Sequence, residues 1–346
     1  MTETAGEDAR GRGGSVESGE TMVTVGFIGL GRICSLLEDD PRREKPATHA
    51  GAFATRSDCR IIGGYDGDQS RREAFAARWN THDYSSADSL LSGDTLPEIV
   101  VIATHPDSHE YYLRMAVNRN VPVVVCEKPI AHTRRSARRM ARLERRGTTR
   151  VVVNHERRFS QDYLLVRRAV EMEELGRLVA IRSQLFFGRT ARHDRVFLHD
   201  GTHLVDAIHF LTNDVIRLRS TIGSYRDTHS SVYMHGHLQR RQIPIVIEVG
   251  AERDYLQFEV DLSFTGGRIR LGNGVFEWSR SQESPYYSGY RSLTPMHRYP
   301  PEPTGYFSGM AAEAVGLVRD RSRKSRSTVE DGLQAMRVIT TAGRWF

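Results

Sequence analysis

The stretch Val23-Thr24-Val25-Gly26-Phe27-Ile28-Gly29-Leu30-Gly31 decides the fold of this chain. A short apolar run that ends in glycines is typical of a buried parallel strand entering a tight turn. Further apolar runs follow at residues 60–65, 98–103, 121–126 and 150–153, and amphipathic helical patterns separate them. Strands that alternate with helices predict an α/β fold built on a doubly wound parallel sheet.

The pattern changes after residue 154. A long amphipathic helix at about 161–175 precedes predicted strands of alternating or mixed pattern, which follow one another at 179–188, 217–226, 243–252, 256–264 and 267–273. Consecutive strands predict an open, mainly antiparallel sheet. We expect a long loop at 279–303 and a closing helix at about 328–343. The predicted organisation is a disordered tail (1–20), an N-terminal domain (21–154) and a C-terminal α/β domain (155–346).

The net charge of +6 comes from one segment. The chain has 346 residues, 49 of them basic and 43 acidic, and such a balance would invite a nucleic-acid or membrane partner. However, residues 131–150 hold eight arginines and one glutamate, which accounts for the whole excess. Arg134, Arg138, Arg142 and Arg146 recur at i+4 spacing, as on a solvated helix face. We therefore expect neither nucleic acid nor a membrane as partner.

The cysteines and the N-terminal residues indicate in which cellular compartment the protein is expected. Cys34, Cys59 and Cys126 form no CxxC or Cys/His cluster, so neither a disulfide framework nor a structural zinc site is indicated. No apolar run reaches the 18 or so residues that cross a bilayer, and the first residues are polar and acidic, unlike a signal peptide. We expect a cytoplasmic protein without a metal.

The segment at residues 29–34 (GLGRIC) matches G-x-G-x-x-G, with small Cys34 at the third glycine position. The first two glycines permit the turn and the close approach of a pyrophosphate, and the third position needs only a small side chain. A tight turn into a helix that binds nothing would look similar. The strand-helix-strand context favours a dinucleotide site.

Asp66 ends the second strand, where an acidic residue binds ribose hydroxyls and repels a 2′-phosphate, so NAD is favoured over NADP. Arg71 and Arg72 keep NADP as an alternative. Asp66 lies 35 residues after Gly31, whereas about 20 is usual. The surplus is a polar segment at 35–48 that interrupts the first helix beside the cofactor turn.

Lys128 follows the fourth strand, at the carboxyl end of the sheet where such folds bind ligands. Only three of the 49 basic residues are lysines, which makes a mere solvated turn residue a weaker interpretation. An ammonium group here can donate to a substrate oxygen and stabilise developing negative charge.

Residues 199–206 (HDGTHLVD) place two histidines and two aspartates in eight positions. On a helix, His199, His203 and Asp206 share one face, with Asp200 at its edge. An imidazole beside a carboxylate is suited to proton exchange near neutral pH. Metal binding by His199 and His203, or simple capping by Asp200, would use the same residues.

Several motifs occur in one order: IGLGRI, the strand-end YD, VVIATHPDSH, CEKP, NHERRF and GTHLVD. Together, over about residues 22–345, they resemble the Gfo/Idh/MocA family of glucose-fructose oxidoreductase and inositol dehydrogenase. The resemblance implies an N-terminal Rossmann domain and a C-terminal domain whose open sheet makes a homodimer or homotetramer. It assigns Lys128 to positioning of substrate and nicotinamide, and His203 to proton transfer. The family usually has Asp four residues before this histidine, so either His199 or Asp200 is left to complete the relay.

The resemblance and the strand ends together yield the predicted site. The catalytic residues are Lys128, His203, Asp200 and His199. Cofactor contacts are expected at Gly29, Gly31, Arg32, Ile33, Asp66, Ala103, Thr104, His105, His109, Glu127 and Lys128. Substrate contacts are expected at Lys128, Arg157, His199, Asp200 and His203. Two of these have alternatives, because His105 could cap the next helix and Arg157 could instead form a salt bridge at the hinge.

The implied activity is NAD(P)-dependent oxidation or reduction of a hydroxyl or ketone carbon in a sugar, cyclitol or sugar derivative. One alternative is a tightly bound NAD used for redox-neutral epimerisation or elimination. Another is a ligand-sensing regulator on the same fold, although a sensor would not need to retain both Lys128 and His203.

Overall fold

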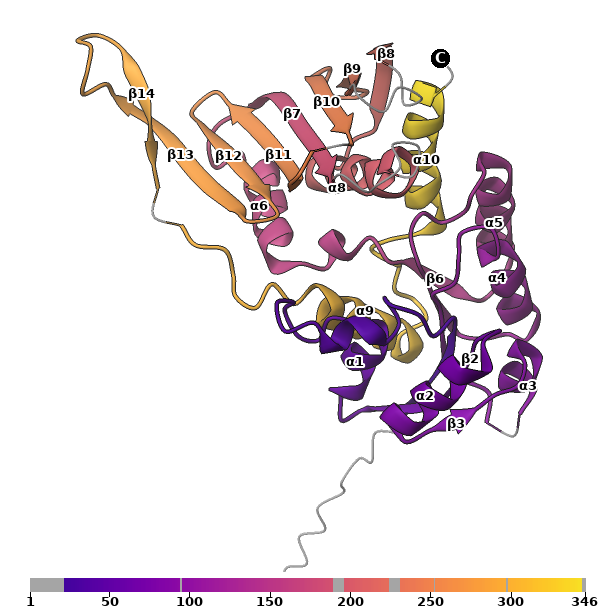
Figure 1. Cartoon of the computed structure of the whole chain (residues 1–346). Coiled ribbons are helices and arrows are strands. Elements are labelled where there is room, and N and C mark those ends of the chain that lie inside the picture. The colour runs from indigo at the N-terminus through magenta and orange to yellow at the C-terminus, as the bar shows by residue number, and fades with distance from the viewer. Residues whose placement is uncertain are drawn as a thin grey trace, which may run out of the picture.

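The computed structural model describes residues 22–93, 95–188, 196–223, 231–251, 253–296 and 298–343. The predicted tail at 1–20 lies outside these residues. The chain forms two sheets, each with its own helices, and the C-terminal sheet lies above the N-terminal one in Figure 1.

The N-terminal sheet has six parallel strands in the order β3-β2-β1-β4-β5-β6. This confirms the predicted Rossmann-type doubly wound sheet. The central strands are entirely buried, as their apolar runs predicted. Two-residue β3 is too short to leave a sequence pattern. The strands are β1 (Val23–Ile28), β2 (Cys59–Tyr65), β3 (His82–Asp83), β4 (Ile99–Ile102), β5 (Val123–Cys126) and β6 (Arg150–Val153).

Helices cover both faces of this sheet (Figure 1). One hydrophobic cluster joins the sheet to α1, α2 and α9, and a second joins it to α3, α4, α5 and the start of α10. The helices are α1 (His49–Ala54), α2 (Gln69–Trp79), α3 (Ala87–Ser92), α4 (His109–Asn118), α5 (Arg134–Arg146), α9 (Tyr306–Arg319) and α10 (Val329–Ala342).

The predicted interruption of the first helix by residues 35–48 is confirmed. A 3₁₀ turn, η1 (Leu36–Asp39), and an irregular loop come first, and α1 has only six residues. The His49 amide donates to the Ile33 carbonyl (3.2 Å) and the Ala50 amide to the Cys34 carbonyl (2.9 Å). Residues 35–48 are therefore looped out of a helix whose hydrogen bonds resume behind them.

The second sheet has eight strands in the order β14-β13-β12-β11-β7-β10-β9-β8, antiparallel except for the β7/β10 pair. This confirms an open, mainly antiparallel sheet. Helices α6 (Gln161–Glu171), α8 (Gly201–Thr212) and α10 lie between it and the first domain (Figure 1). Assembly of copies through this sheet stays a prediction. The strands are β7 (Leu178–Phe187), β8 (Ile216–Ile222), β9 (Val232–Leu238), β10 (Pro244–Gly250), β11 (Leu256–Phe264), β12 (Gly267–Gly272), β13 (Val275–Glu283) and β14 (Arg291–Pro295).

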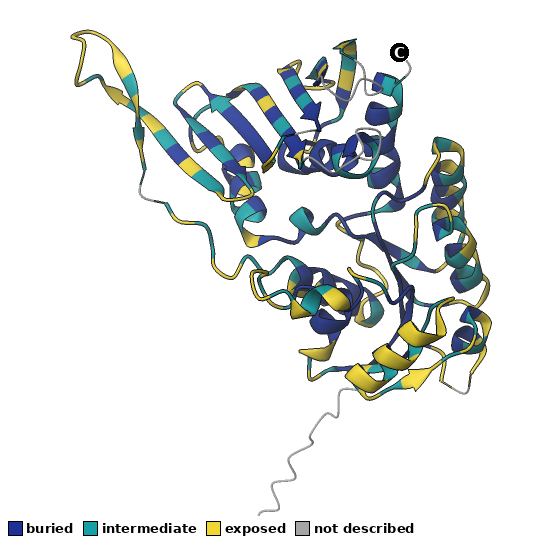
Figure 2. Ribbon diagram, viewed as in Figure 1, coloured by how far each residue is buried: buried dark blue, intermediate teal, exposed yellow. Residues whose placement is uncertain are grey.

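The predicted loop at 279–303 is wrong in its first half. Strands β13 and β14 pair there as a hairpin that projects beyond the body of the protein (Figures 1 and 2). Trp278 is the one fully buried side chain of β13, and the strand lacks an apolar face beyond it. A hairpin exposed on both sides has no hydrophobic alternation for a sequence pattern to reveal.

The predicted division of the chain into domains at residue 154 stays a prediction. Helix α9 does not follow this division, because it packs on the N-terminal sheet. Although it falls within 155–346, its Phe307, Met310 and Ala314 pack in the cluster of the N-terminal sheet. Its first turn is fixed by Glu44 of the looped-out segment, which accepts the amides of Thr304 (2.9 Å) and Gly305 (2.6 Å). The chain therefore returns to the first domain before it ends.

The arginine-rich helix α5 buries Ala137, Met140 and Ala141 and exposes Arg138 and Arg142. Its charge thus lies on a solvent-facing side of the N-terminal domain. Within the described part of the chain, no helix is both long enough and apolar enough to cross a membrane.

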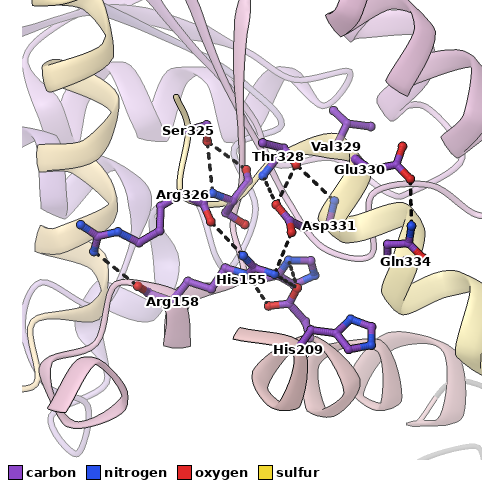
Figure 3. Close-up of polar contacts among 12 residues, drawn as sticks. His155, Arg158, His209, Ser325, Arg326, Thr328, Val329, Glu330, Asp331 and Gln334 are labelled. Atoms are coloured by element: carbon purple, nitrogen blue, oxygen red, sulfur yellow. Dashed lines mark hydrogen bonds and ion pairs between the residues drawn. The ribbon is translucent and has the colours of Figure 1, made fainter. Parts of the chain in front are cut away.

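A buried ionic network joins three elements beside the domain junction (Figure 3). Arg158, in the 3₁₀ turn η2 (Glu156–Arg158), donates two hydrogen bonds of 2.8 Å to the carboxylate of Asp206 on α8. The same guanidinium lies 3.2 Å from Asp331, which caps α10 through the amide of Thr328 (2.8 Å). One buried arginine therefore holds η2, α8 and α10 together.

We expect Arg158→Ala to destabilise the protein strongly, because it leaves the buried Asp206 without its cation. Breaking a buried ion pair on one side costs about 3–5 kcal/mol. Urea denaturation followed by circular dichroism measures the loss. Arg168→Ala removes an exposed arginine from α6 and should change the free energy of unfolding by less than about 0.5 kcal/mol. Equal effects of the two substitutions would contradict a structural role for the network.

Glu144 of α5 is a half-buried acid at the junction. It accepts a hydrogen bond of 3.2 Å from the amide of Val329, the first residue of α10. Burial raises the pKa of the carboxyl to about 7, and the Asp331 charge acts in the same direction. The protonated form is thus favoured in the folded protein.

Since the folded pKa of Glu144 lies above its unfolded value, the folded state holds the proton longer as the pH rises. Stability should fall between about pH 4.5 and pH 7 and level off above. Glu144→Gln should therefore raise the free energy of unfolding by about 2 kcal/mol near pH 8 and lose this advantage near pH 5. Melting curves of wild type and Glu144→Gln across this pH range measure the difference in stability, and Glu283→Gln, at an exposed position, is the control. A constant difference at all pH values would contradict the assignment.

Candidate active site

A cavity of about 540 Å³ lies at the carboxyl ends of β1, β2 and β4. Eight of the predicted cofactor residues line it, together with Leu36, Tyr65, Gly67, Arg71, Asp107, Ser108 and Tyr112. The eight are Gly29, Gly31, Arg32, Ile33, Asp66, Ala103, Thr104 and His105. The topology predicted from the strand pattern thus brings these distant segments to one place.

The two glycines of the turn have different reasons to be glycine. Gly29 has φ +88°, and a Cβ there would come within 2.8 Å of the Ala103 backbone, so the fold itself requires it. A Cβ on Gly31 would meet nothing within 4 Å. Gly31 borders the cavity, so its missing side chain leaves room for a ligand. This open cradle fits a dinucleotide pyrophosphate approaching the backbone.

Asp66 is held at the edge of the same cavity. Its Oδ2 accepts the amide of Leu30 in the glycine turn (2.8 Å) and its Oδ1 accepts the amide of Asp68 (3.0 Å). Arg71 also lines the cavity, whereas Arg72 binds Asp83 (2.9 Å) and the Asp66 carbonyl (2.9 Å) outside it. Of the two arginines, only Arg71 is placed to contact a cofactor.

Three predicted cofactor residues lie elsewhere. His109 is fully buried, with its ring nitrogens 3.1 Å from the Thr104 carbonyl and 3.2 Å from the Ile130 carbonyl. It therefore supports the Thr104 loop from behind and does not line the cavity. Glu127 and Lys128 line a second cavity.

The second cavity, of about 740 Å³, lies between the two domains. Ile33 lines both cavities, which places them side by side. Lys128, Arg157, Asp200 and His203, four of the five predicted substrate residues, line it. His199 is the exception. Opposite domains thus contribute to one space beside the dinucleotide cavity.

Lys128 is paired with Asp200, whose Oδ1 lies 3.2 Å from Nζ. Burial lowers the pKa of the ammonium, but the charges of Asp200, Glu156 and Glu127 outweigh burial, and the pKa lies above its usual value. Lys128 therefore stays protonated and can donate to an oxygen in the cavity.

His203 is paired with Glu156, whose Oε1 lies 2.7 Å from Nε2. The sequence had left His199 or Asp200 as its partner, but Asp200 pairs with Lys128 and the carboxylate beside His203 is that of Glu156. Burial raises the pKa of Glu156, but His203, Arg157 and Lys128 outweigh this and hold it well below its usual range. The pair is thus an imidazole beside an ionised carboxylate.

The predicted helix face holds for His203 and Asp206, which lie one turn apart on α8 and both face His155. Helix α8 begins only at Gly201, however, and His199 belongs to the preceding π-helical turn η3 (Val196–Asp200). The wider turn breaks the i, i+4 relation, and Asp206 binds Arg158 at the domain junction. His155 lies between these groups. Its ring stacks on His203 at 6.2 Å, its Nδ1 is 3.2 Å from Asp206, and burial lowers its pKa to about 4.

Sequence reasoning missed three polar residues of this site: Glu156, His49 and Asn154. The carboxylate of Glu127 lies 2.7 Å from His49 Nε2 and accepts a 2.6 Å hydrogen bond from Asn154. Glu156 and Asn154 belong to the NHERRF motif, so the motif was found without their roles. His49 follows the looped-out segment and carries no local signal.

Arg157 and Arg158 divide the two roles that the sequence left open. Arg158 forms the salt bridge at the hinge. Arg157 lines the cavity, where it donates to Asn273 (2.8 Å) and lies 3.7 Å over the Phe258 ring. Across the described residues, no group of three or more His, Cys, Asp or Glu side chains could hold a metal.

Comparison with known proteins supports this arrangement. Residues 23–155 match the GFO_IDH_MocA model, described as an oxidoreductase family with an NAD-binding Rossmann fold. The chain is 26% identical to the uncharacterized oxidoreductase YhhX of Escherichia coli over 56% of its own length and 62% of that protein. It is 29% identical to inositol 2-dehydrogenase 2 of Saccharopolyspora erythraea over 46% and 44% of the two chains. The chain thus spans less than two thirds of the length of these relatives.

Similarity of fold extends further than similarity of sequence. A solved dehydrogenase from Clostridium difficile superimposes with a TM-score of 0.74 at 15% identity, over 94% of this chain and 99% of that one. Both domains therefore share their architecture with that dehydrogenase. Residues 23–155 thus match the model of the Gfo/Idh/MocA oxidoreductase family, with its NAD-binding Rossmann fold, which confirms the predicted resemblance for this part of the chain.

Proposed function

We propose that this protein is an NAD(P)-dependent oxidoreductase acting on a hydroxyl or ketone carbon of a sugar, cyclitol or sugar derivative. One observation carries the proposal. Two charge pairs, Lys128–Asp200 and His203–Glu156, line a cavity that adjoins the dinucleotide cavity. The relative named inositol 2-dehydrogenase supports a polyhydroxy substrate.

The residues of the cavity can manage the proton and charge of such a reaction. The bound nicotinamide cofactor supplies or accepts the hydride. Lys128, held by Asp200, donates a hydrogen bond to the reacting oxygen and stabilises negative charge on it. His203 takes or returns the hydroxyl proton, and the ionised Glu156 orients its ring and supports the positive charge that the ring acquires.

Glu127, His49 and Asn154 position the lysine. Their hydrogen bonds fix the strand end directly before Lys128, and all three side chains are buried. A catalytic group held by such supports keeps its geometry when substrate binds. A ligand sensor would need neither this support nor a protonated lysine beside a proton-accepting pair.

We expect Lys128→Met to lower kcat by about 10²–10⁴-fold, because it removes the donor to the reacting oxygen. NADH affinity should stay unchanged, because Lys128 lines the second cavity and not the first. Absorbance of NADH measures turnover with sugars and cyclitols, and NADH fluorescence measures binding. Lys324→Met, at an exposed lysine, is the matched control. Normal turnover of Lys128→Met would refute the assigned role.

We expect Asp66→Asn to reduce the preference for NAD over NADP by about tenfold, because it removes the charge that repels a 2′-phosphate. Asparagine retains an oxygen for the Leu30 amide, so the glycine turn should stay intact. Titration of both cofactors gives the ratio. Asp68→Asn, two residues along and outside the cavity lining, is the control. An unchanged ratio in Asp66→Asn would show that Asp66 does not select the cofactor.

A further inference from the structure

We propose that the substrate carries an anionic group, a phosphate or a carboxylate, and that Arg42 and Arg43 of the segment 35–48 bind it together with Arg157. This inference rests on the proposed function, since it names the class of substrate for the same cavity. All three arginines line the cavity that holds Lys128 and His203.

The segment 35–48 has a defined conformation that its own hydrogen bonds hold. Glu38 accepts the amide of Ala47 (3.0 Å) and the hydroxyl of Thr48 (2.6 Å), which closes the segment into a loop. Lys45 donates across the loop to the carbonyls of Asp40 (2.8 Å) and Glu38. Internal hydrogen bonds therefore fix its shape.

Two further contacts fix the loop to the body of the protein. Asp39 forms two 2.8 Å hydrogen bonds with Arg78 of α2. Glu44 binds the Thr304 and Gly305 amides at the start of α9. The acidic residues of the loop thus hold it in place. Arg42 and Arg43, which lie between Asp39 and Glu44 in the sequence, are thereby kept at the cavity.

These arginines lack strong carboxylate partners. Within the described chain, no carboxylate lies within ion-pair distance of the Arg42 side chain. Arg43 lies 3.3 Å from Asp40, but both side chains are about 40% exposed, and such pairs contribute little. Arg157 donates to a neutral amide and lies over an aromatic ring.

The carboxylates of the cavity, in contrast, already have partners. Asp200 pairs with Lys128, Glu156 pairs with His203, and Glu127 binds His49 and Asn154. The remaining two, Glu44 and Asp162, accept amides at the first turns of α9 and α6, where the helix dipole favours negative charge. Among the described residues, Arg42 and Arg43 are thus the cations of the cavity without a buried carboxylate partner, and Arg157 shares the charge of Glu156 with His203 and Lys128.

Arg43 and Arg157 act at the same part of the cavity. Burial and the charges of Glu44 and Glu156 raise the pKa of Tyr306, and both arginines counteract this shift. Tyr306 lines the cavity together with all three arginines. Guanidinium groups that line one cavity suit the oxygens of a phosphate or carboxylate.

The test uses the full chain loaded with NADH, so that the dinucleotide cavity is filled. Inorganic phosphate is titrated by calorimetry into wild type, Arg42→Ala/Arg43→Ala and the control Arg138→Ala/Arg142→Ala. The control removes two exposed arginines from α5. We expect phosphate to bind about tenfold more weakly to Arg42→Ala/Arg43→Ala and with unchanged affinity to the control. Arg42→Lys/Arg43→Lys should recover part of the affinity. Circular dichroism verifies that each variant is folded.

No phosphate binding to wild type, or equal binding to wild type and Arg42→Ala/Arg43→Ala, would overturn the inference. The source of the anion is then found by competition with glucose 6-phosphate, glucuronate and glucose. Stronger competition by the first indicates a phosphate, and by the second a carboxylate. Glucose competing as well as either would also overturn the inference. Failure of both NADH and NADPH to bind would instead refute the proposed function, while the difference between the arginine variants would still report on the anion site.

Discussion

The buried ion pair between Arg158 and Asp206 is the interaction on which the arrangement of the active site depends. Arg158 follows Glu156 and Arg157 in the turn η2, and Asp206 lies one helical turn after His203 on α8. Two parallel hydrogen bonds of 2.8 Å therefore fix the turn that carries Glu156 against the helix that carries His203. The 2.7 Å contact between Glu156 and His203 follows from this clamp. A charge pair deep in the junction sets the geometry of the proton-handling pair in the cavity.

Both domains are needed to form the Lys128–Asp200 pair of the second cavity. Lys128 comes from the end of β5 in the first domain, and Asp200 comes from the turn before α8 in the second. Neither group would keep its partner if the domains separated. Helix α9 strengthens this dependence, because the chain returns through it to the N-terminal sheet after completing the C-terminal one. The cavity is therefore a property of the junction and of no single domain.

The sequence predicted what short-range patterns and strand topology control. Apolar runs located the central strands, and the rule that parallel strands end at one edge brought Gly29, Asp66 and Ala103 to one cavity. Lys128 was found for the same reason. Partners across the junction were not predictable, because the pairing of Glu156 with His203 spans 47 positions and depends on a π-helical turn without a sequence signature. The β13/β14 hairpin was missed because an exposed hairpin has no apolar face to mark it.

The looped-out segment shows how a new wall can be added to a site without disturbing the fold. The hydrogen bonds from His49 to Ile33 and from Ala50 to Cys34 resume the helix as if residues 35–48 were absent. Closing such a loop costs little additional entropy, because the cost rises only slowly with length. Its internal charges, Glu38 and Lys45, then stiffen it, and Glu44 ties it to α9. The glycine turn and the two charge pairs keep their positions, so under the proposed function residues such as Arg42 can select the substrate without changing the reaction.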